Sequence, residues 1–275
     1  MTVSALPHRN RDEWARRGLL WAAVGILVAQ PLVSLVEAVA SWPGPAWSAV
    51  VFCVVIGPAV AIPAGLFASR RAPPTAQPHW KWIVLAVAVM GGWSLAYFAL
   101  GALSEGRGMV RLHTPLDDLI PLWTPSIWIY LTYFWLMITP YLYPGRLTLR
   151  RAALANLAML TVVGCAFLAM PVVMDRPVVG DATLSRYALS ILQASDPAHN
   201  CFPSLHCANA LLAGLLLRET GTRFWPLGVG YALLIAATTL TTKQHWVADV
   251  GAGLAAAVVV WLVVFRPWRA RAGPS

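Results

Sequence analysis

Long apolar runs follow one another along most of this chain, and they constrain its fold more than any other feature. An α-helix needs about 20 apolar residues to cross the hydrocarbon core of a bilayer. We predict about eight such helices, at residues 18–40, 47–69, 82–103, 125–143, 153–174, 204–217, 224–239 and 246–265. Only 11% of the residues are charged, against about 25% in an average soluble domain. The sequence therefore predicts an all-α fold, a polytopic transmembrane helical bundle.

The basic residues concentrate on one side of this predicted threading. With the N-terminus in the cytoplasm, fifteen of the 20 Lys and Arg residues fall in cytoplasmic loops and tails, as the positive-inside rule expects. The five on the opposite side are Arg107, Arg111, Arg176, Arg186 and Lys243. The net charge of +9 thus indicates membrane topology and not a nucleic-acid partner. We expect both termini in the cytoplasm.

The first apolar run carries a signal-peptidase-like sequence at its end. Residues 38–40 read Ala-Val-Ala and are followed by Ser41. The run is longer than the roughly 7–15 apolar residues of a secretory signal. A retained helix is therefore favoured over a cleaved signal.

The first of two polar motifs lies just before the run at 204–217. Pro203 and Ser204 are typical of a helix start, which puts His206 in the first turn. A helix N-terminus presents free N–H groups and partial positive charge, and both suit a phosphate. The alternative is that His206 is simply a satisfied histidine at the membrane interface.

The second motif contains His245 and Asp249, which are four residues apart. On a helix this spacing puts both side chains on one face. The carboxylate can then accept the Nδ1–H of the ring and leave Nε2 as an acceptor or nucleophile. A buried polar pair without chemistry is the alternative. Both motifs are predicted at the exoplasmic surface, and this shared location favours a functional site there.

The four cysteines do not show the spacing of a metal site. Cys53 and Cys165 fall inside predicted helices, where cysteine commonly acts as a small apolar residue. Cys201 and Cys207 flank the first motif, and a disulfide between them requires an oxidising compartment. We expect no metal and no cofactor.

Together these motifs resemble the type 2 phosphatidic acid phosphatase superfamily, the lipid phosphate phosphatases. The family's Pro-Ser-x-His core matches residues 203–206, its His-x-x-x-Asp motif matches His245 and Asp249, and its Arg-Pro motif matches Arg176 and Pro177. The resemblance implies a six-helix core at residues 82–265. Residues 1–81 would then form a tail and two extra transmembrane helices, and residues 266–275 a basic cytoplasmic tail.

The sequence departs from the family pattern at two cationic positions. Thr239 stands where the family usually has Arg, and Ala169 stands where it usually has Lys. Lys243 can supply a replacement cation. This pattern is similar to the inositol phosphorylceramide synthase branch. A phosphodiester carries one negative charge and needs fewer fixed cations than a phosphomonoester, so transfer from a phosphodiester lipid is favoured.

The resemblance also implies a role for each matched residue. His245 would attack phosphorus and form a phosphohistidine, Asp249 would fix its tautomer, and His206 would act as general acid and base. The phosphoryl oxygens would be held by Ser204, Arg176 and Lys243. Asp117 and Asp118 are candidates for contact with an acceptor hydroxyl, with a simple charged loop as the alternative. Arg186, Asp196 and His199 are weaker candidates, for which a solvated loop residue is the favoured interpretation.

Two other functions remain open from the sequence. A lipid phosphate phosphatase acting on phosphatidic acid or an isoprenyl phosphate would use the same groups, with water as the acceptor. A transporter would use His245 and Asp249 as a proton relay. The motifs lie at one predicted surface and not at the bilayer midplane, so an enzyme acting on a membrane lipid is favoured.

Overall fold

The computed structural model describes residues 79–104, 107–142, 145–196 and 198–272. The predicted helices at residues 18–40 and 47–69 and the signal-peptidase-like sequence lie outside these residues. Within the described residues the chain is helical and forms no strand, as predicted; one isolated bridge joins Val110 and Val172.

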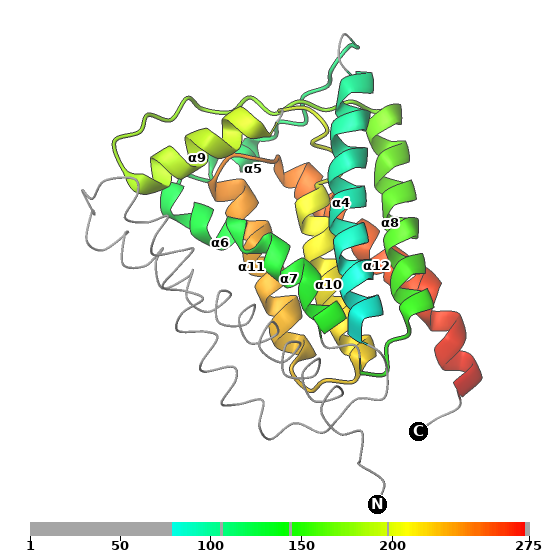
Figure 1. Cartoon of the computed structure of the whole chain (residues 1–275). Helices are drawn as coiled ribbons and strands as arrows, with labels where there is room; N and C mark the ends of the chain where they lie inside the picture. The colour runs from blue at the N-terminus through cyan, green and yellow to red at the C-terminus, as the bar shows by residue number, and fades with distance from the viewer. Residues whose placement is uncertain (1–78, 105–106, 143–144, 197, 273–275) are drawn as a thin grey trace, which may run out of the picture.

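The helical elements follow one another along the bundle, and the longest connections lie at the end that carries α5 and α9 (Figure 1). In chain order they are α4 (His79–Ser104), α5 (Pro115–Asp118), the 3-10 turn η2 (Thr124–Ser126), α6 (Ile127–Leu131), α7 (Tyr133–Leu142), α8 (Leu149–Ala169), α9 (Leu184–Ser195), α10 (Leu205–Thr220), α11 (Trp225–Thr241) and α12 (Val247–Ala272).

Three helices of the described residues are long and apolar enough to cross a membrane. They are Val84–Ser104, Leu149–Ala169 and Val247–Arg266, and Trp225–Thr241 is a shorter apolar helix. Their outward faces carry large apolar side chains, among them Val87, Leu95, Leu157, Leu227 and Val263. Apolar side chains on the outside of a bundle indicate contact with lipid, as in an integral membrane protein. The predicted total of about eight spans includes helices outside the described residues.

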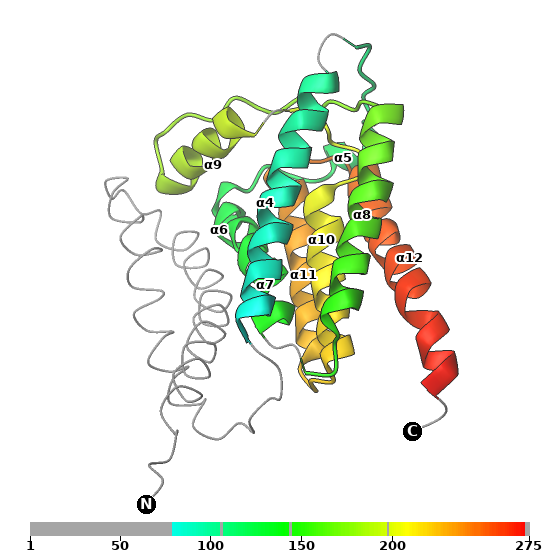
Figure 2. The same ribbon diagram turned by 45° about the vertical axis from the view of Figure 1, so that its right-hand side comes forward.

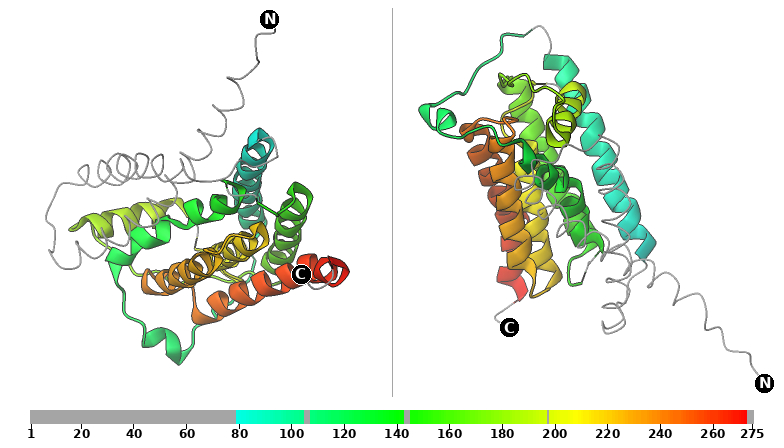
Figure 3. Two further views of the ribbon diagram at one scale, coloured as in Figure 1. Left: turned by 90° about the horizontal axis from the view of Figure 1, so that it is seen from below. Right: turned by 90° about the vertical axis from the view of Figure 1, so that its left-hand side faces the viewer.

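Helix α10 forms the centre of the bundle. It packs against α7, α8, α11 and α12, and α4 covers α7 and α8. The view from below in Figure 3 shows the α10–α11 pair (yellow to orange) between α7 (green) and α12 (red). Because it is surrounded, α10 buries nearly all of its side chains, which are mostly Leu and Ala.

Small residues bring α10 and α11 into close contact. A Cβ atom added to Gly214 of α10 would lie 2.9 Å from the backbone nitrogen of Val229 on α11. A Cβ added to Gly228 of α11 would lie 2.6 Å from a methyl carbon of Leu217. Close backbone approach at small residues is a common basis of helix packing in membranes.

Among the predicted helices that differ from the structure, two differ for a reason in the local sequence. The helix predicted at 153–174 ends at Ala169, because Pro171 disfavours helical geometry at Met170, which adopts φ −140° and ψ 86°. The helix predicted at 125–143 is divided into η2, α6 and α7. At the division, the Thr132 hydroxyl bonds to the Ile129 carbonyl and competes with the helical pattern.

The polar motifs gather at one end of the bundle. Helix α10 begins, α11 ends and α12 begins at the same end, beside α5 and α9 (Figures 1 and 2). Helix α9 lies in the connection between α8 and α10 and packs on η2 and α6. Leu184 and Leu189 bury one face of α9 against Ile127 and Tyr130. This packing holds α9 against α6 at this end of the bundle.

Candidate active site

Ser204 and His206 occupy the positions predicted for them at the start of α10. Ser204 is the N-cap, and its hydroxyl accepts a hydrogen bond from the backbone N–H of Cys207 at 3.4 Å. Ser204 is fully buried. His206 follows in the first helical turn, so its ring lies next to the free N–H groups of the helix start.

His245 and Asp249 meet in a different way from the one predicted. Helix α12 begins at Val247, so His245 precedes the helix and the pair does not share a helical face. Asp249 lies in the first turn, and its Oδ2 atom accepts the backbone N–H of Trp246 at 2.9 Å, as an acidic side chain does at a helix start. The Nδ1 atom of His245 lies 3.6 Å from the same oxygen. The expected proximity exists, at a distance longer than a hydrogen bond.

The two motifs are joined through their backbones. The N–H of Ser204 donates to the carbonyl of Asp249 at 2.9 Å. Gly253, one turn further along α12, faces Ser204 so closely that a Cβ atom would collide with the Ser204 carbonyl oxygen. A glycine is therefore required where α12 crosses the start of α10.

The rings of His206 and His245 lie side by side at this crossing. Their centroids are 5.7 Å apart, and Nε2 of His245 lies 3.5 Å from Nδ1 of His206. His245 is 6% exposed and Asp249 is fully buried. The predicted proximity of the two histidines is thus confirmed, while their chemical roles stay predictions.

Two tyrosines from the broken helix hold His206. The hydroxyl of Tyr130 on α6 lies 2.9 Å from Nε2 of His206. The ring of Tyr133 on α7 packs edge-on against the same imidazole, with 4.9 Å between centroids. Sequence reasoning missed both residues. They lie more than 70 residues from His206 in an apolar run, and no local spacing links them to the motif.

Arg176 reaches the site as part of an ion pair. Its guanidinium binds the Asp196 carboxylate at 3.0 Å and also donates to the Asp196 backbone carbonyl at 2.5 Å. The same carboxylate accepts the hydroxyl of Tyr97 on α4 at 2.7 Å. Both charged groups lie within electrostatic range of His206. The site therefore contains a buried cation that Asp196 largely balances.

Lys243 has a partner that the sequence did not indicate. It adopts a left-handed backbone conformation with φ 53°, and its ammonium donates to the backbone carbonyl of Asp117 at 2.9 Å. Asp117 is buried, and its carboxylate accepts the backbone N–H groups of Thr114 and Val247, both at 2.8 Å. Asp117 therefore links α5 to the start of α12.

These hydrogen bonds also lower the pKa of the Asp117 carboxyl group. Burial by itself raises the pKa of this carboxyl, but the bonds from Thr114 and Val247 outweigh burial and hold the pKa below its usual value. Asp117 is thus a charged structural link at neutral pH. Two of the other weak candidates have local partners: Asp118 pairs with His113 at 2.8 Å, and the ring of His199 packs against Gly101. Arg186 is exposed.

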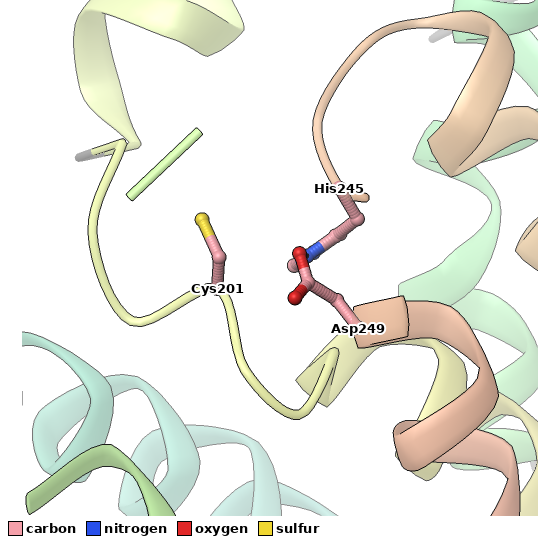
Figure 4. Close-up of side chains that lie close together, drawn as sticks. All are labelled: Cys201, His245 and Asp249. Carbon is pink, nitrogen blue, oxygen red and sulfur yellow. The ribbon is translucent and has the colours of Figure 1, made fainter. Parts of the chain in front are cut away.

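Cys201 is the remaining polar group beside His245. Cys201 and Cys207 are both free thiols, so the disulfide considered from the sequence is not formed. One ligand atom from each of Cys201, His245 and Asp249 lies within 4.8 Å of the other two (Figure 4). Burial and the nearby Asp249 carboxylate raise the pKa of the Cys201 thiol, which is therefore protonated at neutral pH.

Comparison with protein-family models connects this geometry to a known group of proteins. Residues 152–272 match the PAP2 superfamily. The match runs from α8 to the end of α12 and includes all six predicted site residues, so the PAP2 match supports a phosphatase or phosphotransferase activity. It does not distinguish the inositol phosphorylceramide synthase branch. Comparisons with curated proteins and with solved structures gave no match.

Proposed function

We propose that this protein is a membrane-embedded lipid phosphotransferase that works through a phosphohistidine on His245. The observation that carries the proposal is the contact between His206 and His245, 3.5 Å apart at the crossing of α10 and α12. The match to the PAP2 superfamily supports the same class of reaction. The lipid substrate would reach the site from the bilayer around the bundle.

In the first step His245 acts as the nucleophile. The lone pair on Nε2 forms a bond to phosphorus, and the bond from phosphorus to the lipid oxygen breaks. His206, as imidazolium, gives its proton to that oxygen, and the lipid alcohol leaves. Asp249 stabilises the positive charge that develops on the His245 ring, from 3.6 Å at Nδ1.

In the second step the same groups work in reverse. Neutral His206 takes the proton of the incoming hydroxyl, whose oxygen attacks phosphorus. The nitrogen–phosphorus bond breaks, and its electron pair returns to Nε2 of His245. An alcohol acceptor gives head-group transfer and water gives hydrolysis, because both supply a hydroxyl to His206.

Substrate binding must separate the two rings. A reacting phosphorus atom lies about 3–3.5 Å from its nucleophile, and no such atom fits between two nitrogens that are 3.5 Å apart. Opening this gap requires His206 to loosen its contacts with Tyr130 and Tyr133, or the loop that carries His245 before α12 to shift.

The charge of the site favours a diester donor. Asp196 pairs with Arg176 at 3.0 Å, and Lys243 donates to the Asp117 carbonyl at 2.9 Å. Thr239, where the family has an arginine, is fully buried and within 3.6 Å of the Cys207 sulfur. Because Asp196 balances the charge of Arg176 and position 239 carries no arginine, a singly charged phosphodiester is stabilised better than a monoester dianion.

The decisive experiment follows the labelled phosphorus. Purified protein is incubated with phosphatidylinositol and ceramide in one reaction and with phosphatidic acid in another. We expect the phosphoinositol group to move to ceramide at a rate well above phosphate release from phosphatidic acid. Phosphate release alone, with no transfer to any alcohol, would instead assign the protein as a lipid phosphate phosphatase.

A further inference from the structure

We propose that Cys201, His245 and Asp249 bind a thiophilic divalent cation such as Zn²⁺, and that the bound ion inhibits the enzyme. The proposal that the three residues bind a cation rests on their geometry. The inhibition rests on the function proposed above.

The three side chains already lie close to the geometry of a metal site. They come together from the loop before α10 and from the start of α12 (Figure 4), with ligand atoms within 4.8 Å of one another. Zn²⁺ holds nitrogen and oxygen at about 2.0–2.2 Å and sulfur at about 2.3 Å, so its ligand atoms lie about 3.5 Å apart. Shifts of about 1 Å would close the triangle around an ion.

Two buried polar atoms of these side chains lack a hydrogen bond. Nδ1 of His245 and Oδ1 of Asp249 are buried and make no hydrogen bond within the part of the chain that the structure describes. His245 is 6% exposed, Asp249 0% and Cys201 1%. Buried polar atoms are nearly always paired, and a cation between them would pair both.

The kinds of donor atom select the kind of ion. A thiolate, an imidazole and a carboxylate form a mixed sulfur, nitrogen and oxygen set, which suits Zn²⁺ or Co²⁺ and not Mg²⁺ or Ca²⁺. The thiolate and the carboxylate together balance the charge of a divalent ion. Binding releases the proton of the Cys201 thiol, since a coordinating thiol is deprotonated.

Inhibition follows from the two nitrogens of one imidazole. Nδ1 of His245 faces Asp249, and Nε2 faces His206. A neutral imidazole has one nitrogen lone pair in the ring plane and one N–H. If Nδ1 binds the metal, the proton moves to Nε2, which then has no lone pair for phosphorus. The ion also withdraws Asp249 from its role beside Nδ1.

Binding is tested by cobalt spectroscopy on the full-length protein in detergent. We expect Co²⁺ to give a thiolate-to-cobalt charge-transfer band, which Cys201→Ala abolishes. Cys207→Ala is the matched control, because Cys207 is equally buried but packs against Thr239. The charge-transfer band should remain in the Cys207→Ala variant. Absence of the band from the wild type, or its persistence in Cys201→Ala and Cys201→Ser, would overturn the site.

Inhibition is tested separately by titrating turnover with Zn²⁺. Changes in outer-shell partners alone alter metal affinity about 10–100-fold, so loss of the thiolate should raise the half-inhibiting Zn²⁺ concentration at least about tenfold. Chelator should restore the wild-type rate. A cobalt band combined with Zn²⁺-insensitive or Zn²⁺-stimulated turnover would overturn the inhibition. A protein without lipid turnover but with the cobalt band would overturn the proposed reaction and leave the metal site standing.

Discussion

Tyr130 holds the general acid in place through a single hydroxyl. Its oxygen lies 2.9 Å from Nε2 of His206, whose Nδ1 lies 3.5 Å from His245. When His206 is neutral, a hydroxyl that donates to Nε2 keeps the one ring proton on Nδ1, on the side of the nucleophile. Tyr130 is therefore a positioning residue that acts through His206.

Removing this hydroxyl should slow the reaction without unfolding the site. One hydrogen bond is worth about 0.5–1.5 kcal/mol, so we expect Tyr130→Phe to lower kcat about two- to tenfold and to shift the limb of the pH–rate profile that reports His206. The control is Tyr133→Phe, because the Tyr133 ring also packs on His206 but its hydroxyl bonds to Asn209 and Met137. Equal losses in the two variants would contradict the role of the Tyr130 hydroxyl.

At the residue scale, the sequence predicted which residues form the site better than it predicted the contacts between them. The start of α10 at Ser204 follows from local capping chemistry, and His245 lies close to Asp249 as expected, although the two do not share a helical face. Neither pattern indicates that Asp249 first satisfies the backbone N–H of Trp246, or that Cys201 lies beside His245. Such contacts depend on where loops cross in three dimensions, and sequence spacing does not contain that information.

At the scale of elements, the site depends on how closely α12 crosses the start of α10. Gly253 faces the Ser204 carbonyl with no room for a Cβ atom, whereas Gly251 has no atom within 4 Å of its Cβ position. Gly253→Ala should push the helices apart and move His245 away from His206. A misplacement near 1 Å can cost on the order of a hundredfold in rate. The turnover of Gly253→Ala should fall by about that factor, and Gly251→Ala should stay near the wild-type rate. Similar rates in the two variants would show that the close crossing of α12 and α10 does not position the histidines.

The link between α5 and α12 should make stability depend on pH. The pKa of Asp117 is lower in the folded protein than its usual value of 3.8. The carboxylate therefore contributes its full stabilisation above about pH 4 and loses it as pH falls through the lower folded-state pKa. Thermal unfolding in detergent should show Asp117→Asn less stable than the wild type at pH 7, with the difference shrinking toward pH 3. The exposed Asp118→Asn is the control, and a constant difference across this range would contradict the link.

At the scale of the whole molecule, the bundle separates a polar end from a basic end. The starts of α10 and α12 lie at one end, and the connections carrying Arg146 and Arg223 lie at the other (Figure 1). The sequence predicted this separation, because hydropathy and charge set the order of helices and loops. It did not predict the break near Thr132 or the early end of α8, because Thr and Pro act on the backbone locally inside apolar runs.

The predicted orientation can be tested on intact cells. Val178 lies in the loop before α9 and is fully exposed, and Phe224 lies in the connection between α10 and α11 with 55% of its surface exposed. A membrane-impermeant maleimide should label Val178→Cys in intact cells and Phe224→Cys only after permeabilisation. The unsubstituted protein gives the background from its own cysteines. The reverse pattern would place the site on the cytoplasmic face.

The central claim is that His245 carries the phosphoryl group, and trapping that group tests it most directly. His206→Ala should still react with a nitrophenyl phosphoester, because nitrophenolate leaves without a proton, but the second step then lacks its base. The variant should release a burst of about one nitrophenolate per protein. Mass spectrometry of the alkali-quenched sample should find the modification on the peptide containing His245, and none in the His206→Ala/His245→Ala double variant. A burst with the modification on any other residue, or steady turnover by His245→Ala, would contradict the mechanism.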